Sequence, residues 1–83
     1  MTAPLPDAAI RLYDRLRELD PETRAHTINA EYGAMIGTSG RTVTAALRRL
    51  AEAGHICIRR DAPHPLRHTT GRYIDVLEDG VWR

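Results

Sequence analysis

The sequence contains no lysine, a single cysteine and no long apolar run. One thiol, Cys57, cannot form an internal disulfide, and a lone thiol is typical of a reducing compartment rather than of a secreted scaffold. No segment approaches the roughly 18 consecutive apolar residues of a membrane-spanning helix, and the N-terminal residues lack the apolar core of a signal peptide. We therefore expect a cytoplasmic protein with no membrane partner.

Motifs of catalysis and cofactor binding are also missing. The chain has no glycine-rich loop that would cradle a phosphate and no recognisable acid–base pair, so we expect neither an enzyme nor a cofactor. His55, Cys57, His64 and His68 do gather in one stretch, and the spacing of His64 and His68 occurs in some metal sites. Because one thiol with scattered imidazoles is more often structural, we predict no metal site and keep zinc sensing as the alternative.

The length of the chain sets its domain organisation. With 83 residues and no internal repeat, it has room for one domain and one core, which we assign to residues 1–83. A domain of this size buries a modest fraction of its surface, so a partner subunit would help to stabilise it.

The net charge of +1 conceals an uneven distribution of charge along the chain. Residues 41–73 carry seven arginines against two acidic residues, a net charge of +5, whereas residues 1–40 and 74–83 each carry −2. One contiguous basic segment is typical of a surface that contacts a polyanion. The exclusive use of arginine fits bidentate contacts with phosphate or guanine, although a codon bias of the genome would produce the same composition.

Apolar residues recur with helical spacing in two N-terminal segments. The period of Ala9, Leu12 and Leu16 predicts a helix over residues 7–19 that Asp7 caps and that ends before Pro21. The following PETRAHTI segment is predicted to be a connection, with a short extended piece at residues 26–28. A second helix is predicted over residues 29–36, capped by Asn29 and ended by Gly37 in a positive-φ conformation.

The segment TSGRTVTAALRRLAEAG predicts a third helix over residues 39–53, with Ser39 as its cap and Gly54 as its stop. Val43, Leu47 and Leu50 form its apolar face and should press against Tyr32, Ile36 and the first helix. We expect Tyr13 and Tyr32 to belong to the core with their hydroxyl groups near the surface. Two helices joined around a glycine form a helix-turn-helix, in which the second helix enters a DNA groove.

After Gly54 the period of the apolar residues changes from 3.6 to 2. Ile56 and Ile58 alternate with polar residues over 55–60, and Ile74 and Val76 do so over 72–77, which predicts two paired strands. The loop 61–71 between them is too long for a tight turn and is predicted to project as a wing, and residues 78–83 form a tail. The expected fold class is α+β and mostly helical: three helices followed by a C-terminal β-hairpin.

Residues 28–60, with the loop and strand that follow, resemble the winged helix-turn-helix domain of bacterial and phage transcription regulators, including the GntR-like and catabolite-activator-like heads. The residues that carry this resemblance are Gly33, Gly37, Ser39, Val43, Leu47, Leu50 and Gly54. The sequence departs from the family at Gly33, where alanine is usual, and we expect this glycine to weaken the second helix by about 1 kcal/mol. It departs again at Ala45, where some members carry a long base-reading side chain.

The helix-turn-helix interpretation assigns DNA contacts to the basic segment. Near the start of the recognition helix we predict contacts from Thr38, Ser39, Gly40, Arg41, Thr42 and Thr44. Arg41 can pair bidentately with a guanine and Thr44 can meet a thymine methyl or a phosphate, while Arg48 reaches a backbone phosphate. Arg67 in the wing is predicted to contact flanking phosphates or the minor groove, and Arg59, Arg60 and Arg72 are weaker candidates for such contacts.

These features predict a sequence-specific regulator that binds double-stranded DNA, of the small repressor type found in phages and mobile elements. We expect a homodimer on two half-sites roughly 34 Å apart, with the apolar Val81 and Trp82 of the tail as one possible seam. Two alternatives stay open. A winged helix can serve as a protein-interaction module or inhibitor that docks on a nucleoprotein complex, or as an architectural or excision-type protein that bends DNA.

Overall fold

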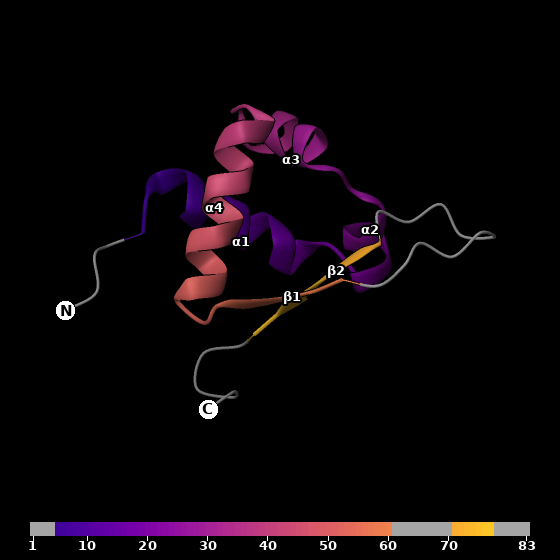
Figure 1. Ribbon diagram of the computed structural model, residues 1–83. Coiled ribbons are helices and arrows are strands. Elements are labelled where there is room, and N and C mark those ends of the chain that lie inside the picture. The colour runs from indigo at the N-terminus through magenta and orange to yellow at the C-terminus, as the bar shows by residue number, and fades with distance from the viewer. Residues whose placement is uncertain (1–4, 61–70, 78–83) are drawn as a thin grey trace.

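The structure is a computed structural model that describes residues 5–60 and 71–77. In this part of the chain, four helices precede a two-stranded antiparallel sheet (Figure 1). The helices are α1 (Asp7–Glu18), α2 (Pro21–His26), α3 (Asn29–Ile36) and α4 (Gly40–Glu52), and the strands are β1 (Ile56–Arg60) and β2 (Arg72–Val76). The predicted α+β, mostly helical class is confirmed. Residues 61–70 of the expected wing and the tail 78–83 lie outside the described residues.

One apolar cluster joins α1, α3, α4 and both strands. Its buried members are Ala9, Leu12, Leu16, Tyr32, Ile36, Val43, Ala46, Leu47, Leu50, Ile56 and Ile74. The predicted apolar faces of α1 and α4 are confirmed, because each contributes residues three or four positions apart that lie on one side of the helix. Burial of these side chains supplies most of the free energy that holds such short helices in place.

Helix α2 corrects the prediction of a simple connection after residue 20. Asp20 and Pro21 do end α1, but they also begin a new helix: Asp20 Oδ1 accepts a hydrogen bond from the Thr23 amide at 2.7 Å, and Pro21 occupies the first helical position. This hydrogen bond lowers the pKa of Asp20. Proline needs no hydrogen-bond partner at that position, so a residue that stops one helix can start the next. Helix α2 buries Ala25 and packs against β2.

The predicted helix caps are right at α4 and wrong at α1 and α3. Ser39 Oγ accepts a hydrogen bond from the Thr42 amide at 3.2 Å, and Gly37 and Gly54 end α3 and α4 with φ of 76° and 81°. Asp7 and Asn29 are instead the first helical residues, after the extended Pro6 and Ile28. The Asn29 side chain is therefore available for contacts outside its own helix.

The hairpin pairs Ile56 with Val76, Ile58 with Ile74 and Arg60 with Arg72. The predicted alternation is confirmed, because Ile56 and Ile74 are buried in the core while Cys57 between the isoleucines is exposed. Each strand is one residue shorter than predicted. The Tyr13 hydroxyl donates a hydrogen bond to the Leu77 carbonyl at 2.9 Å and so ties α1 to the end of β2.

Tyr32 lies deeper than predicted. Its ring is fully buried, and its hydroxyl donates to the Arg24 carbonyl at 3.3 Å inside the protein rather than at the surface. Burial raises the pKa of this hydroxyl above its usual value. The expected surface position of the Tyr32 hydroxyl is therefore wrong, because α2, which was not predicted, supplies its partner.

Gly33 permits the close approach of α3 to the turn that follows it. A Cβ atom at this position would lie 2.5 Å from the Thr38 carbonyl oxygen and 3.0 Å from the Ser39 carbonyl carbon. The Thr38 amide also donates to the Gly33 carbonyl at 2.7 Å, which fixes the turn against the helix. The glycine therefore has a packing role that offsets its low helix propensity.

We predict that Gly33→Ala lowers the free energy of unfolding by about 1–3 kcal/mol, because the added methyl group meets backbone atoms that cannot swing aside. Urea unfolding followed by circular dichroism measures the effect. Ala34→Gly, at an exposed position of the same helix, is the control and should cost about 1 kcal/mol through helix propensity alone. A Gly33→Ala protein as stable as the parent would contradict the close approach.

Candidate nucleic-acid interface

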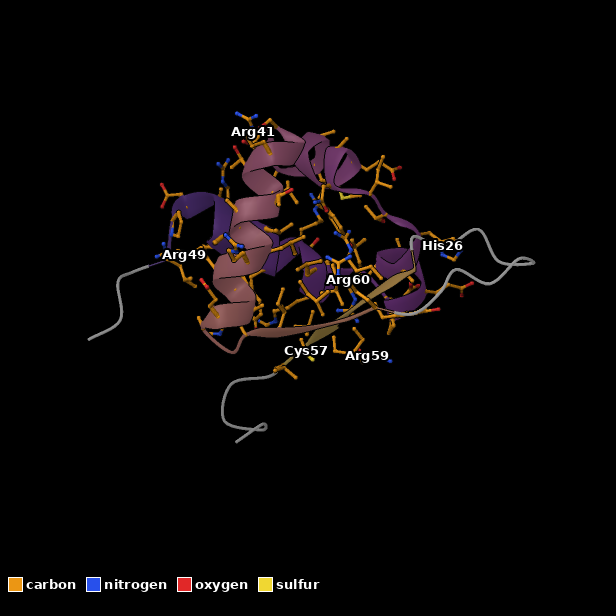
Figure 2. The ribbon with its side chains drawn as sticks, in the orientation of Figure 1. His26, Arg41, Arg49, Cys57, Arg59 and Arg60 are labelled. Atoms are coloured by element: carbon orange, nitrogen blue, oxygen red, sulfur yellow. The ribbon has the colours of Figure 1, made fainter. Side chains whose placement is uncertain are left out.

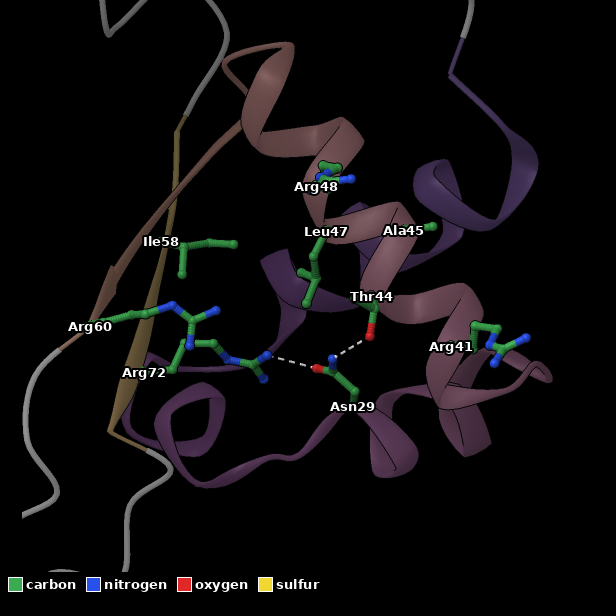
Figure 3. A pocket seen from close by; sticks show the side chains of 9 residues that line it. All are labelled: Asn29, Arg41, Thr44, Ala45, Leu47, Arg48, Ile58, Arg60 and Arg72. Atoms are coloured by element: carbon green, nitrogen blue, oxygen red, sulfur yellow. Dashed lines mark hydrogen bonds between the residues drawn. The ribbon is translucent and has the colours of Figure 1, made fainter.

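A groove of about 720 Å³ lies between the outward side of α4 and the hairpin (Figure 3). Its lining residues come from the start of α3, from α4 and from both strands: Asn29, Arg41, Thr44, Ala45, Leu47, Arg48, Ile58, Arg60 and Arg72. Four of these nine side chains are arginines and none is acidic. Because none of the described lining residues carries a carboxylate, the groove is a positively charged depression suited to an anionic ligand.

Arg41 and Arg48 are the exposed arginines of α4 that line this groove. Arg41 extends from the first turn of the helix, whose N-terminal end carries the positive pole of the helix dipole (Figure 2). Within residues 5–60 and 71–77, neither guanidinium forms a hydrogen bond or an ion pair. Both guanidinium groups are therefore free to bind a ligand.

Three of the hydroxyl groups predicted to contact DNA, those of Ser39, Thr42 and Thr44, already have partners inside the protein. Ser39 Oγ caps α4 and lies 3.2 Å from Thr42 Oγ1. Thr44 Oγ1 donates to the Gly40 carbonyl at 3.0 Å. Thr38 is half-buried, and its carbonyl oxygen faces Gly33. These residues shape the start of α4, and the guanidinium groups of Arg41 and Arg48 are the charged groups that face a ligand there.

A chain of hydrogen bonds crosses the floor of the groove from the hairpin to α4. Arg72 Nη1 donates to Asn29 Oδ1 at 2.7 Å, and Asn29 Nδ2 donates to Thr44 Oγ1 at 2.9 Å (Figure 3). Arg72 Nη2 donates to the Thr27 carbonyl at 3.1 Å. Only 9% of Arg72 is exposed, and this burial lowers the pKa of its guanidinium. Arg72, expected among the weaker phosphate-tracking arginines, thus links three elements internally.

Of the other described arginines in residues 41–73, Arg60 lines the groove, whereas Arg49 and Arg59 lie outside it. Arg59 forms an ion pair with Asp75, with contacts of 2.6 and 3.1 Å, and lies over the Tyr73 ring at 5.3 Å. Its hydrogen bond lowers the pKa of the Asp75 carboxyl group. Arg49 is exposed but does not line the groove. Arg60 does line it, and its neighbour Arg59 points away from the groove (Figure 2).

Several predicted candidates cannot be placed. Arg67, His64 and His68 lie outside the described residues. Of the proposed histidine and cysteine group, His55 packs against the Tyr13 ring at 5.5 Å and Cys57 is exposed. In the described part of the chain, no three His, Cys, Asp or Glu side chains are grouped so that they could hold a metal ion.

No helix of that part is long and apolar enough to cross a membrane.

Sequence reasoning missed the internal contacts of Asn29 and Arg72, and it ranked Arg60, which lines the groove, among the weaker candidates. Asn29 was interpreted as a cap, and its contact with Arg72, 43 residues further along the chain, depends on the tertiary fold. One available signal was the hairpin register. With Ile58 opposite Ile74, Arg60 must stand opposite Arg72, so two like charges share one position of the sheet.

We predict that Arg72→Met lowers the free energy of unfolding by about 2–3 kcal/mol, because the Thr27 carbonyl and the Asn29 side chain lose a charged donor. Urea unfolding at pH 7 measures this loss. Arg59→Met is the matched control, since its exposed ion pair should contribute less than about 1 kcal/mol. Equal losses of unfolding free energy in the two variants would show that the hydrogen bonds of Arg72 stabilise the fold no more than an exposed ion pair does.

Comparison of the chain with protein-family models, with curated proteins and with solved structures found no match. Functional inference therefore depends on the residues and geometry of the chain itself.

Proposed function

We propose that this chain is a winged helix-turn-helix protein that binds double-stranded DNA sequence-specifically and regulates transcription. The observation that carries the proposal is Arg41, which is exposed in the first turn of α4 and unpaired among the described residues. It lines a groove whose described lining includes four arginines and no acidic residue. Helix α3, the turn at Gly37 and helix α4 have the order and capping of a helix-turn-helix. In this proposal, the hairpin that follows α4 corresponds to the wing.

In the proposed complex, α4 enters the major groove with its N-terminal end toward the base edges. Arg41 forms two hydrogen bonds with the O6 and N7 atoms of a guanine, the pairing that the geometry of guanidinium favours. Arg48 neutralises a backbone phosphate and so positions the helix without reading sequence. Because the hydroxyls of Ser39, Thr42 and Thr44 have internal partners, discrimination by polar contacts falls mainly to Arg41.

Two copies bound to a palindromic site would give such a small reader its specificity, with half-sites roughly 34 Å apart. The proposal is tested by selecting bound duplexes from a random pool and titrating the selected duplex at several salt concentrations. We expect an enriched motif and an affinity that falls steeply as salt rises, because bound phosphates release counterions. Absence of duplex binding, together with retention on an acidic nucleoprotein partner, would favour the protein-interaction alternative.

We predict that Arg41→Ala weakens binding to the selected duplex by about 1–3 kcal/mol and removes the base preference at one position. Fluorescence anisotropy with the selected duplex and its single-base variants measures both effects. Arg49→Ala is the control, because Arg49 has equal charge on the same helix but lies outside the groove. Equal effects of the two substitutions would mean that Arg41 acts only through its charge.

A further inference from the structure

Arg60 and Arg72 form a like-charged pair at the end of the hairpin. They stand directly opposite each other in the antiparallel register, and both line the groove beside α4. Like charges at opposed positions of a sheet destabilise it. The repulsion reaches Arg72 itself, since the charge of Arg60 adds to the burial that lowers the pKa of Arg72.

The two arginines of this pair are held very differently. Arg72 is buried, and its guanidinium donates to the Thr27 carbonyl and to Asn29. Arg60 is exposed and has no hydrogen bond or ion pair within the described residues. The preceding residue, Arg59, shows that this strand can compensate an arginine. Asp75, two positions along β2 from Tyr73, the residue opposite Arg59, forms an ion pair with Arg59 at 2.6 Å. Among residues 5–60 and 71–77, no carboxylate pairs with Arg60.

The described residues that line the space beside the pair include no acidic side chain. A second hollow, of about 240 Å³, is lined by Ile28, Asn29, Arg60 and Arg72, so the two arginines border both depressions. Ile28 is 52% exposed at its rim, and α3 begins there at Asn29. A compact oxyanion at this position would meet one free guanidinium, one fixed guanidinium and no negative charge from any lining residue.

We propose that Arg60 and Arg72 form a phosphate site that, in the complex with duplex DNA, holds one backbone phosphodiester. The assignment to a phosphodiester rests on the proposed function. Arg60 supplies the hydrogen-bond donors, since its guanidinium is free, while Arg72 supplies a fixed charge because Thr27 and Asn29 hold it in place. The bound oxyanion relieves the repulsion between the two arginines. The site makes a sequence-independent contact, separate from the base contact of Arg41.

The first experiment compares the full-length protein with its Arg60→Gln and Arg59→Gln variants on a duplex selected from a random pool. We expect Arg60→Gln to reduce the slope of log affinity against log salt by about 1 and to weaken all duplexes alike. Arg59→Gln, its ion-paired neighbour, should leave the slope unchanged. Duplexes with single uncharged methylphosphonates should reveal one position that weakens the parent protein but not Arg60→Gln.

The second experiment uses no DNA and measures thermal unfolding with pyrophosphate as the probe, against sodium chloride of equal ionic strength. Pyrophosphate should raise the Tm of the parent and of Arg59→Gln but not that of Arg60→Gln. In low salt without pyrophosphate, Arg60→Gln should unfold at a higher temperature than the parent, because the like-charged pair is gone.

The two experiments separate the site from the proposed function. A pyrophosphate shift that depends on Arg60, in a protein that binds no duplex, supports the phosphate site and contradicts DNA binding. Duplex binding with the same salt slope in Arg60→Gln as in the parent, and the same response of both proteins to pyrophosphate, overturns the phosphate site while DNA binding stands.

Discussion

The burial of one side of α4 is the constraint on which the other features of the molecule depend. A helix of 13 residues is marginal by itself in water, so its angle and rotation are set by what its apolar side contacts. Val43, Leu47 and Leu50 lie against α1, α3 and the strands in the single core of the described residues. Once those side chains are inside, the rotation of the helix places Arg41 and Arg48 outside.

The opposite side of α4 is held by polar contacts. The hydrogen bonds from Arg72 through Asn29 to Thr44 connect the hairpin, α3 and α4 on the floor of the groove. Burying a guanidinium costs free energy, and the hydrogen bonds of Arg72 to the Thr27 carbonyl and to Asn29 offset that cost. Arg72 fixes the orientation of the hairpin, because its planar guanidinium must form hydrogen bonds with the Thr27 carbonyl and with Asn29 at the same time. The hairpin is thereby fixed relative to α4, and so is the distance between Arg41 and Arg60.

Local patterns in the sequence predicted the features that depend only on residues close together in the chain. The stripes of α1 and α4, the Ser39 cap, the Gly37 stop and the alternating strands all follow from spacing alone. Helix α2 was missed because Asp20-Pro21 was interpreted only as a stop, although the same pair is a good start. The contacts of Asn29 and the burial of Arg72 could not be predicted, because each requires segments 43 residues apart to be placed first. The packing reason for Gly33 is of the same kind.

The low net charge of +1 does not weigh against a polyanionic ligand, because charge acts locally in salt solution. At physiological ionic strength the Debye length is about 8 Å, so exposed charges on distant faces are largely screened from the groove. None of the acidic residues that the structure describes lines the groove, and Asp75 forms an ion pair with Arg59. A ligand in the groove therefore meets the field of the four arginines, and the acids elsewhere limit non-specific attraction at longer range. Because the arginines line the groove and the acidic residues lie elsewhere, a ligand is attracted to the groove itself rather than to the net charge of the molecule.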